Sequence, residues 1–120
     1  MNPVRSEMTG AMIDSSSEQH RHECECRAVL AMQPRERRAE FIAGVAKKRG
    51  DVSALAIKRD VLLIHMLRLP ASTLEDGPDP VDRFLSNLAA KEGYAFAESL
   101  RLRYQECLDA LASNLSTTTP

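Results

Sequence analysis

The chain of 120 residues has no tryptophan and only two tyrosines and three phenylalanines. Its core must therefore be built mainly from leucine, alanine, valine, isoleucine and methionine, a mixture that favours helices over sheets. The hydrophobic content of 43% is close to that of globular proteins and argues against extensive disorder. We therefore predict an all-α fold, a small bundle of four to five helices with short turns and one longer linker, in one compact domain.

Long hydrophobic runs are also absent. The longest, from Val61 to Leu69, contains His65 and Arg68 and is far shorter than the roughly 20 residues of a membrane-spanning helix. The first residues lack the apolar stretch of a signal peptide. We expect a soluble cytoplasmic protein that does not bind a membrane, with His65 as a neutral core histidine.

Cysteine is scarce and oddly placed. Three are present, Cys24, Cys26 and Cys107, and an odd number with a C-x-C spacing does not make a disulfide framework. Reduced thiols in a cytosol are the simpler interpretation.

Four potential zinc ligands nevertheless follow one another at spacings of two: His20, His22, Cys24 and Cys26. On a helix they separate into two pairs, His20 with Cys24 and His22 with Cys26, about 160° apart. One metal ion cannot bind all four, and no second pair of ligands follows downstream. We predict no bound metal or cofactor; the alternative is a metal site shared across a dimer.

Catalytic motifs are missing as well. The five glycines are scattered, and none belongs to a phosphate-binding loop or flanks a nucleophilic serine. Glu23 and Glu25 disfavour the thiolate form of the cysteines beside them, which argues against a cysteine nucleophile. We predict that the protein is not an enzyme.

Capping residues and prolines divide the chain into helices. Ser15 with Glu18, or Ser16 one residue later, starts a helix that ends near Met32. Pro34 is placed to begin the next helix, which Gly50 ends. The segments that we predict are a disordered start at 1–14, a basic three-helix unit at 15–69, a linker at 70–80, acidic C-terminal helices at 81–115 and a tail at 116–120.

Two further signals mark helix starts: Asp51 can cap the third helix, and Asp79 before Pro80 can cap the fourth. The third helix is apolar all round from Val61 to Leu67, and the last helix has an apolar seam from Ala97 to Leu115. These two surfaces predict a homodimer; the alternative is that they bury each other within one chain.

The net charge of −1 conceals an asymmetry, because residues 21–68 carry a balance of +5 and residues 69–120 a balance of −4. The basic candidate partner-binding residues are Arg35, Arg37, Arg38, Lys47, Lys48 and Arg49. The acidic candidates are Glu75, Asp76, Asp79 and Asp82, with Glu92 and Glu98 further along the same surface. The basic group is also interpretable as an ordinary solvated face.

The pattern H-E-C-E-x-R-x-V-L at residues 22–30, with E-R-R at 36–38 and K-K-R-G at 47–50, resembles a family of small uncharacterised phage and prophage proteins. The resemblance covers about residues 20–64 and implies no activity and no site residues. It implies an accessory protein expressed inside a bacterium, and small phage proteins often occlude host complexes, including CRISPR defence systems.

We therefore predict a non-enzymatic protein-interaction module, phage-encoded, that binds and inhibits or modulates a host protein or nucleoprotein complex in the bacterial cytoplasm. The alternative is a small DNA- or RNA-binding protein that uses the basic residues of the second and third helices.

Overall fold

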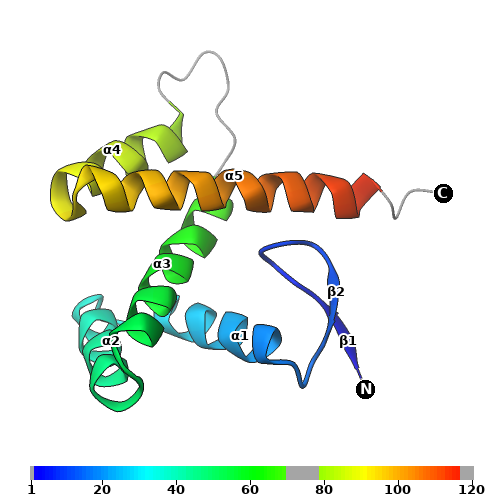
Figure 1. Ribbon diagram of the computed structural model, residues 1–120, viewed down its shortest axis with the longest axis horizontal. Coiled ribbons are helices and arrows are strands. Elements are labelled where there is room, and N and C mark those ends of the chain that lie inside the picture. Colours follow the sequence, from blue (N-terminus) through cyan, green and yellow to red (C-terminus); the bar gives the residue numbers. More distant parts are fainter. Residues whose placement is uncertain (1, 70–78, 117–120) are drawn as a thin grey trace.

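The computed structural model describes residues 2–69 and 79–116. The elements are β1 (Pro3–Arg5), β2 (Met12–Asp14), α1 (Glu18–Leu30), α2 (Glu36–Arg49), α3 (Asp51–Leu67), α4 (Pro80–Glu92) and α5 (Tyr94–Ser116). Helix α3 packs against α1, α2 and α5, while α4 stacks along the first half of α5 (Figure 1). The predicted all-α class is confirmed, with a two-stranded hairpin added to it.

The N-terminal segment differs from the prediction of disorder. Its two short strands pair antiparallel, with Val4 opposite Ile13. The tip packs on α5: Gly10 has a φ of +77°, and a Cβ atom there would lie 3.2 Å from Leu111. Contacts with distant helices stabilise this hairpin, and a local reading of residues 1–14 could not detect them.

Helix α1 begins later than either predicted capping box. Ser17 is the N-cap, and its hydroxyl accepts from the backbone N–H of His20 at 3.2 Å. Asp14 places Ser17 there, because the Asp14 carbonyl accepts from the Ser17 hydroxyl at 2.6 Å and the Asp14 carboxylate accepts from the Ser16 N–H at 3.0 Å. The Asp14 turn therefore delays the helix past Ser15 and Ser16.

The other helix boundaries mostly follow the sequence signals, but Pro34 does not begin the second helix as predicted, because α2 starts at Glu36 with Arg35 as its N-cap. Gly50 ends α2 with a φ of 95°, a conformation that favours glycine. Asp51 was predicted to cap the third helix, but it is the first residue of α3 and its side chain makes no capping hydrogen bond. The start of α4 is confirmed, since the Asp79 carboxylate accepts from the Val81 N–H at 2.9 Å.

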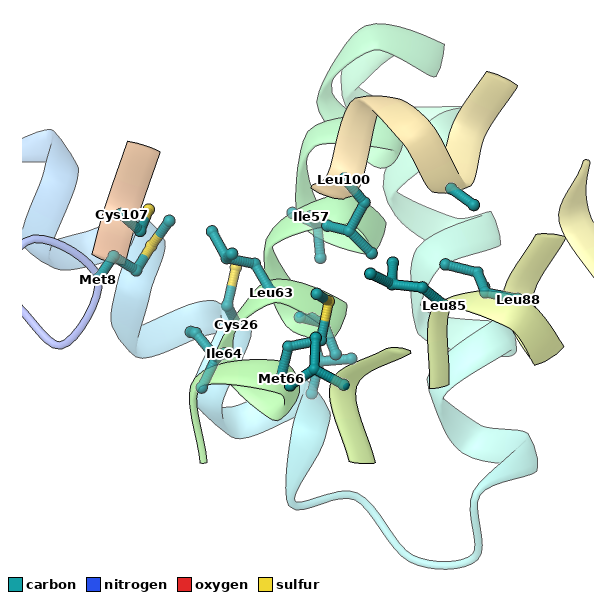
Figure 2. Close-up of a cluster of buried hydrophobic side chains, with 14 of the residues drawn as sticks. Met8, Cys26, Ile57, Leu63, Ile64, Met66, Leu85, Leu88, Leu100 and Cys107 are labelled. Carbon is teal, nitrogen blue, oxygen red and sulfur yellow. The ribbon is translucent and has the colours of Figure 1, made fainter. Parts of the chain in front are cut away.

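The hydrophobic core runs from the hairpin to α4 with α3 at its centre. Figure 2 shows it extending from Met8 and Cys107 through Leu63 to Leu85 and Leu88. The apolar run of α3 is buried within the chain, and so are much of the α5 seam and Cys26. The homodimer was predicted because these two apolar surfaces were expected to need a partner. In the structure, residues of the same chain cover most of both.

Two predicted segments lie wholly or partly outside the described residues. Residues 70–78 of the expected linker are not described, and residues 79 and 80 belong to the start of α4. Residues 117–120 of the expected tail are not described either, while Ser116 ends α5. No helix in the described part of the chain is long and apolar enough to cross a membrane.

Candidate functional site

A groove of about 570 Å³ lies between α2, α3 and α4. Its apolar lining is formed by Ala39, Ile42, Ala43, Ala46, Val61, Leu62 and Leu88. The α2 members recur at spacings of three and four, which places them on one face of the helix. Three of them are alanines, whose short side chains leave the space between α2 and α4 unfilled. Figure 1 shows these two helices set apart on the same side of α3.

The groove also has a basic rim. Arg35 is the N-cap of α2, Arg38 lies in the first turn of that helix, Lys58 comes from α3 and Lys91 from α4. Glu92 is the one acid of the lining, and its Oε1 lies 2.6 Å from the Lys58 Nζ. Among the described residues, no carboxylate pairs with the other three cations. The groove therefore combines an apolar floor with positive charge on its α2 and α4 walls.

Lys58 fixes the position of the α4 wall. Besides its ion pair with Glu92, its ammonium lies 5.4 Å from the centroid of the Phe96 ring in α5. A cation over an aromatic face is attracted to it. Lys58 thus connects α3 to both helices of the α4–α5 pair, and we assign it a structural role.

The α2 wall is fixed at its N-terminal end by Arg38. The Arg38 Nη2 donates to the carbonyl of Leu30, the last residue of α1, at 2.6 Å. The Arg38 Nε is buried and has no hydrogen-bond partner in the described structure. Nearby, burial together with Arg38 and Arg35 lowers the pKa of His65, whose ring lies 5.0 Å from that of Phe84. These effects favour the neutral form of His65, which is half-buried and not, as predicted, part of the core, and the positive charge here belongs to the arginines.

The predicted basic residues do not form one surface. Arg35 and Arg38 line the groove, whereas Arg37 and Lys48 lie beside Phe41 on another side of α2. Arg49 binds Glu25 of α1 through two hydrogen bonds of 2.7 and 3.2 Å, and this contact raises the pKa of Arg49. Lys47 is exposed. Arg49 therefore connects α1 to α2, and Arg38 does so through the Leu30 carbonyl. Among the described residues, no carboxylate pairs with the remaining four, Arg35, Arg37, Lys47 and Lys48.

The predicted acidic residues are largely engaged in the fold. Asp79 caps α4, and Asp82 lies 3.4 Å from Arg101 of α5. Glu98 also pairs with Arg101, at 3.6 Å. Glu75 and Asp76 lie outside the described residues. Within the described part, Asp79, Asp82 and Glu98 each have a partner inside the chain, and a binding role for the acidic candidates stays a prediction.

A second polar centre surrounds Asp60, whose side chain is only 1% exposed. Its carboxylate accepts from His22 Nε2 at 2.7 Å, Arg103 Nε at 2.8 Å and Arg59 Nε at 3.0 Å. Burial raises the pKa of Asp60, but these hydrogen bonds outweigh it and hold the pKa well below its usual range. The bond to Asp60, followed by one to Cys26, raises the pKa of His22 to about 10. The cluster joins α1, α3 and α5.

Glu23 is a second buried carboxylate, also 1% exposed, and it holds the hairpin. It accepts from the Ser6 hydroxyl at 2.6 Å, the Glu7 N–H at 2.9 Å and Gln19 Nε2 at 3.2 Å. Glu7 in turn binds Arg68 at 2.7 Å, and this hydrogen bond lowers the pKa of Glu7. The buried carboxylate satisfies backbone and hydroxyl donors that the turn would otherwise leave unpaired.

The histidines and cysteines of α1 form the two predicted pairs. Cys24 Sγ lies 3.3 Å from His20 Nε2, and Cys26 Sγ lies 3.6 Å from His22 Nε2. Because the same nitrogen of His22 also binds Asp60, these groups are not arranged as a nucleophile, base and orienting acid, which needs both ring nitrogens. In the described ranges, no three His, Cys, Asp or Glu side chains are grouped to hold a metal ion.

Sequence reasoning missed Asp60 and Lys91. A signal for Asp60 was available, because it lies on the same face of α3 as Ile57 and Ile64, both buried in the core. A charged residue at a core-facing position implies a buried partner. Lys91 had no such signal, since its place on the groove depends on how α4 sits against α3.

Residues 13–68 are similar to a family of unknown function (DUF7696). This match covers somewhat under half of the chain, includes α1, α2 and α3, and leaves out α4 and α5. No curated protein and no solved structure matches the chain. The similarity to this uncharacterised family therefore covers the α2 and α3 walls of the groove and not its α4 wall.

Proposed function

We propose that this protein is a non-enzymatic protein-interaction module whose binding surface is the groove between α2, α3 and α4. The observation that carries the proposal is the combination of an apolar floor with Arg35, Arg38 and Lys91, three cations that no described acid neutralises. A protein partner would bury the floor and supply carboxylates to the rim.

The finer proposal is that the partner is a host macromolecular complex, which a phage-encoded accessory protein inhibits or modulates in the bacterial cytoplasm. It rests on the sequence resemblance, with CRISPR complexes as one kind of target, and the groove adds only a surface that could occlude such a complex.

Nucleic-acid binding is the second candidate. Arg37, Lys47 and Lys48 are exposed cations of α2 without an acidic partner among the described residues, and phosphates could bind them. They lie outside the groove lining. The two candidates therefore depend on different cations, those that line the groove and those of α2 outside it.

Affinity capture from a bacterial lysate, with and without nuclease, distinguishes the candidates. We compare the natural chain with Arg35→Glu/Lys91→Glu, which reverses charge on both groove walls, and with Arg37→Glu/Lys48→Glu, which makes the same charge change outside the groove. A specific complex that survives nuclease and is lost only with the groove variant supports the proposal. Nuclease-sensitive capture that is lost with the Arg37/Lys48 variant supports nucleic-acid binding instead.

A further inference from the structure

We infer that the groove accepts an acidic amphipathic helix, about three turns long, with an apolar stripe flanked by carboxylates on both sides. The inference rests on the proposed function and specifies its partner. Three features support it: the length of the groove, the placement of its charges and the nature of its walls.

The length follows from α2. The lining residues of this helix extend from Arg35 to Ala46, and at 1.5 Å per residue this interval spans about 16 Å, or three helical turns. Outside the groove lining, the exposed Leu55 lies three residues before Lys58 and seven before Leu62, on the same face of α3. A helix of about 11 residues or slightly more therefore matches the apolar floor.

The charge of the partner follows from the two walls. Arg35 and Arg38 stand on α2 and Lys91 on α4, so unpaired positive charge faces the floor from both sides. An occupant with acids on one flank only would leave one wall uncompensated. Acids on both flanks, with apolar residues at spacings of three and four between them, complement both walls and the floor.

The helical conformation follows from the absence of a free sheet edge in the groove. An extended peptide binds best where it adds a strand to unpaired backbone groups. The described lining comes entirely from α2, α3 and α4, whose mid-helix N–H and C=O groups are already bonded within each helix. A helix forms its backbone hydrogen bonds internally and needs only side-chain contacts with the groove. It therefore loses no backbone hydrogen bonds by binding here.

Nucleic acid fits this groove less well. Phosphates need cations on an accessible surface, whereas the floor of this groove is apolar. Three other cations of α2 that pair with no described acid lie outside the groove. Burying seven apolar residues against a polar backbone would gain little free energy.

The test uses the full chain and four fluorescent probes. These are a hydrocarbon-stapled 14-residue helix with leucines on one face and glutamates on both flanks, the same peptide with lysines in place of the glutamates, a scrambled peptide of the same composition, and a 20-base-pair DNA duplex. Binding is followed by anisotropy, and the bound face is mapped from amide chemical shifts at peptide concentrations up to about 1 mM.

We expect the acidic amphipathic peptide to bind at least about tenfold more tightly than the lysine and scrambled peptides, and to shift the amides of α2, α3 and α4 around the groove. The Arg35→Glu/Lys91→Glu variant should weaken binding by about tenfold or more, while Arg37→Glu/Lys48→Glu should change it by less than about threefold.

Equal binding of the acidic, lysine and scrambled peptides overturns the inference, and so does no binding at the highest concentration. Tighter binding of the duplex, or self-association that depends on Arg35 and Lys91, also overturns it by replacing the occupant with nucleic acid or a second copy. If the peptides fail while capture from lysate still depends on Arg35 and Lys91, only the helical partner is wrong. If capture does not depend on them either, the proposed function fails as well.

Discussion

The hairpin, α1 and the second half of α5 differ from the α2–α4 side of the molecule in how they use charge. Around Asp60 and Glu23, buried carboxylates are surrounded by donors from distant parts of the chain. Around the groove, Arg35 and Lys91 have no acidic partner among the described residues. The first region uses its charge to stabilise the fold, and the second leaves charge without an acidic partner among the described residues.

Replacing Asp60 by asparagine should have the largest effect. It would leave the cationic groups of His22, Arg59 and Arg103 next to one another without their counter-charge. Removing one partner of a buried ion pair typically costs 3–5 kcal/mol, and because these cations are partly exposed we expect about 3 kcal/mol. Urea unfolding followed by circular dichroism measures it.

The matched control is Asp51→Asn, which removes an exposed carboxylate from the first turn of the same helix. It should change the free energy of unfolding by less than about 1 kcal/mol. A similar effect of the two substitutions would show that the Asp60 cluster contributes no more than an ordinary surface charge, and would remove the contrast between the regions.

Replacing Glu23 by glutamine should loosen the hairpin. A neutral amide accepts more weakly from the Ser6 hydroxyl and the Glu7 N–H, and we expect a loss of about 2 kcal/mol. Hydrogen exchange should accelerate over residues 3–14 and remain unchanged in α2. The exposed Glu18→Gln is the control; accelerated exchange across all helices, instead of the hairpin alone, would contradict the assigned role.

The Asp60 cluster also predicts a pH dependence. Because the pKa of His22 is raised to about 10 in the folded chain, its contribution to stability is complete below about pH 6.5 and is lost as the pH rises towards 10. The lowered pKa values of Asp60 and Glu7 have the opposite sign, so their contributions are lost as the pH falls below about 4. The pKa of His65 is also lowered, so this histidine costs stability as the pH falls below about 6.5, and stability should be greatest near that value.

The His22→Gln variant isolates the alkaline side of this profile. The natural chain should lose more stability than the variant between about pH 6 and 9, as measured by urea unfolding at both values. Identical losses in the two proteins would mean that His22 and Asp60 do not share a proton-dependent interaction.

The smallest effect is expected at the groove. Arg35→Ala/Lys91→Ala should change the free energy of unfolding by no more than about 0.5 kcal/mol, as is usual for surface residues without partners. Arg103→Ala, which removes a cation from Asp60, should cost clearly more in the same thermal or urea assay. If the groove variant were destabilised as much as Arg103→Ala, Arg35 and Lys91 would be stabilising the fold, which would contradict this account.

The contrast also explains what could be read from the sequence. Helices and most of their ends follow from local signals such as Gly50 and the Asp79–Pro80 start of α4, which act within one turn. The hairpin was missed because Glu23, 16 or 17 residues away, holds it. The groove was not predicted: Arg35 and Arg38 were identified only as basic candidates, and the positions of Lys91 and the apolar floor depend on the packing of helices distant in sequence.

Hydrogen–deuterium exchange of the chain with and without its captured partner tests the central claim most directly. The account predicts slower exchange around residues 35–46, 58–62 and 88–92, which contain the groove lining, and no change around residues 6–10 and 103–110. Protection of the hairpin and the second half of α5, with the groove unchanged, would contradict it.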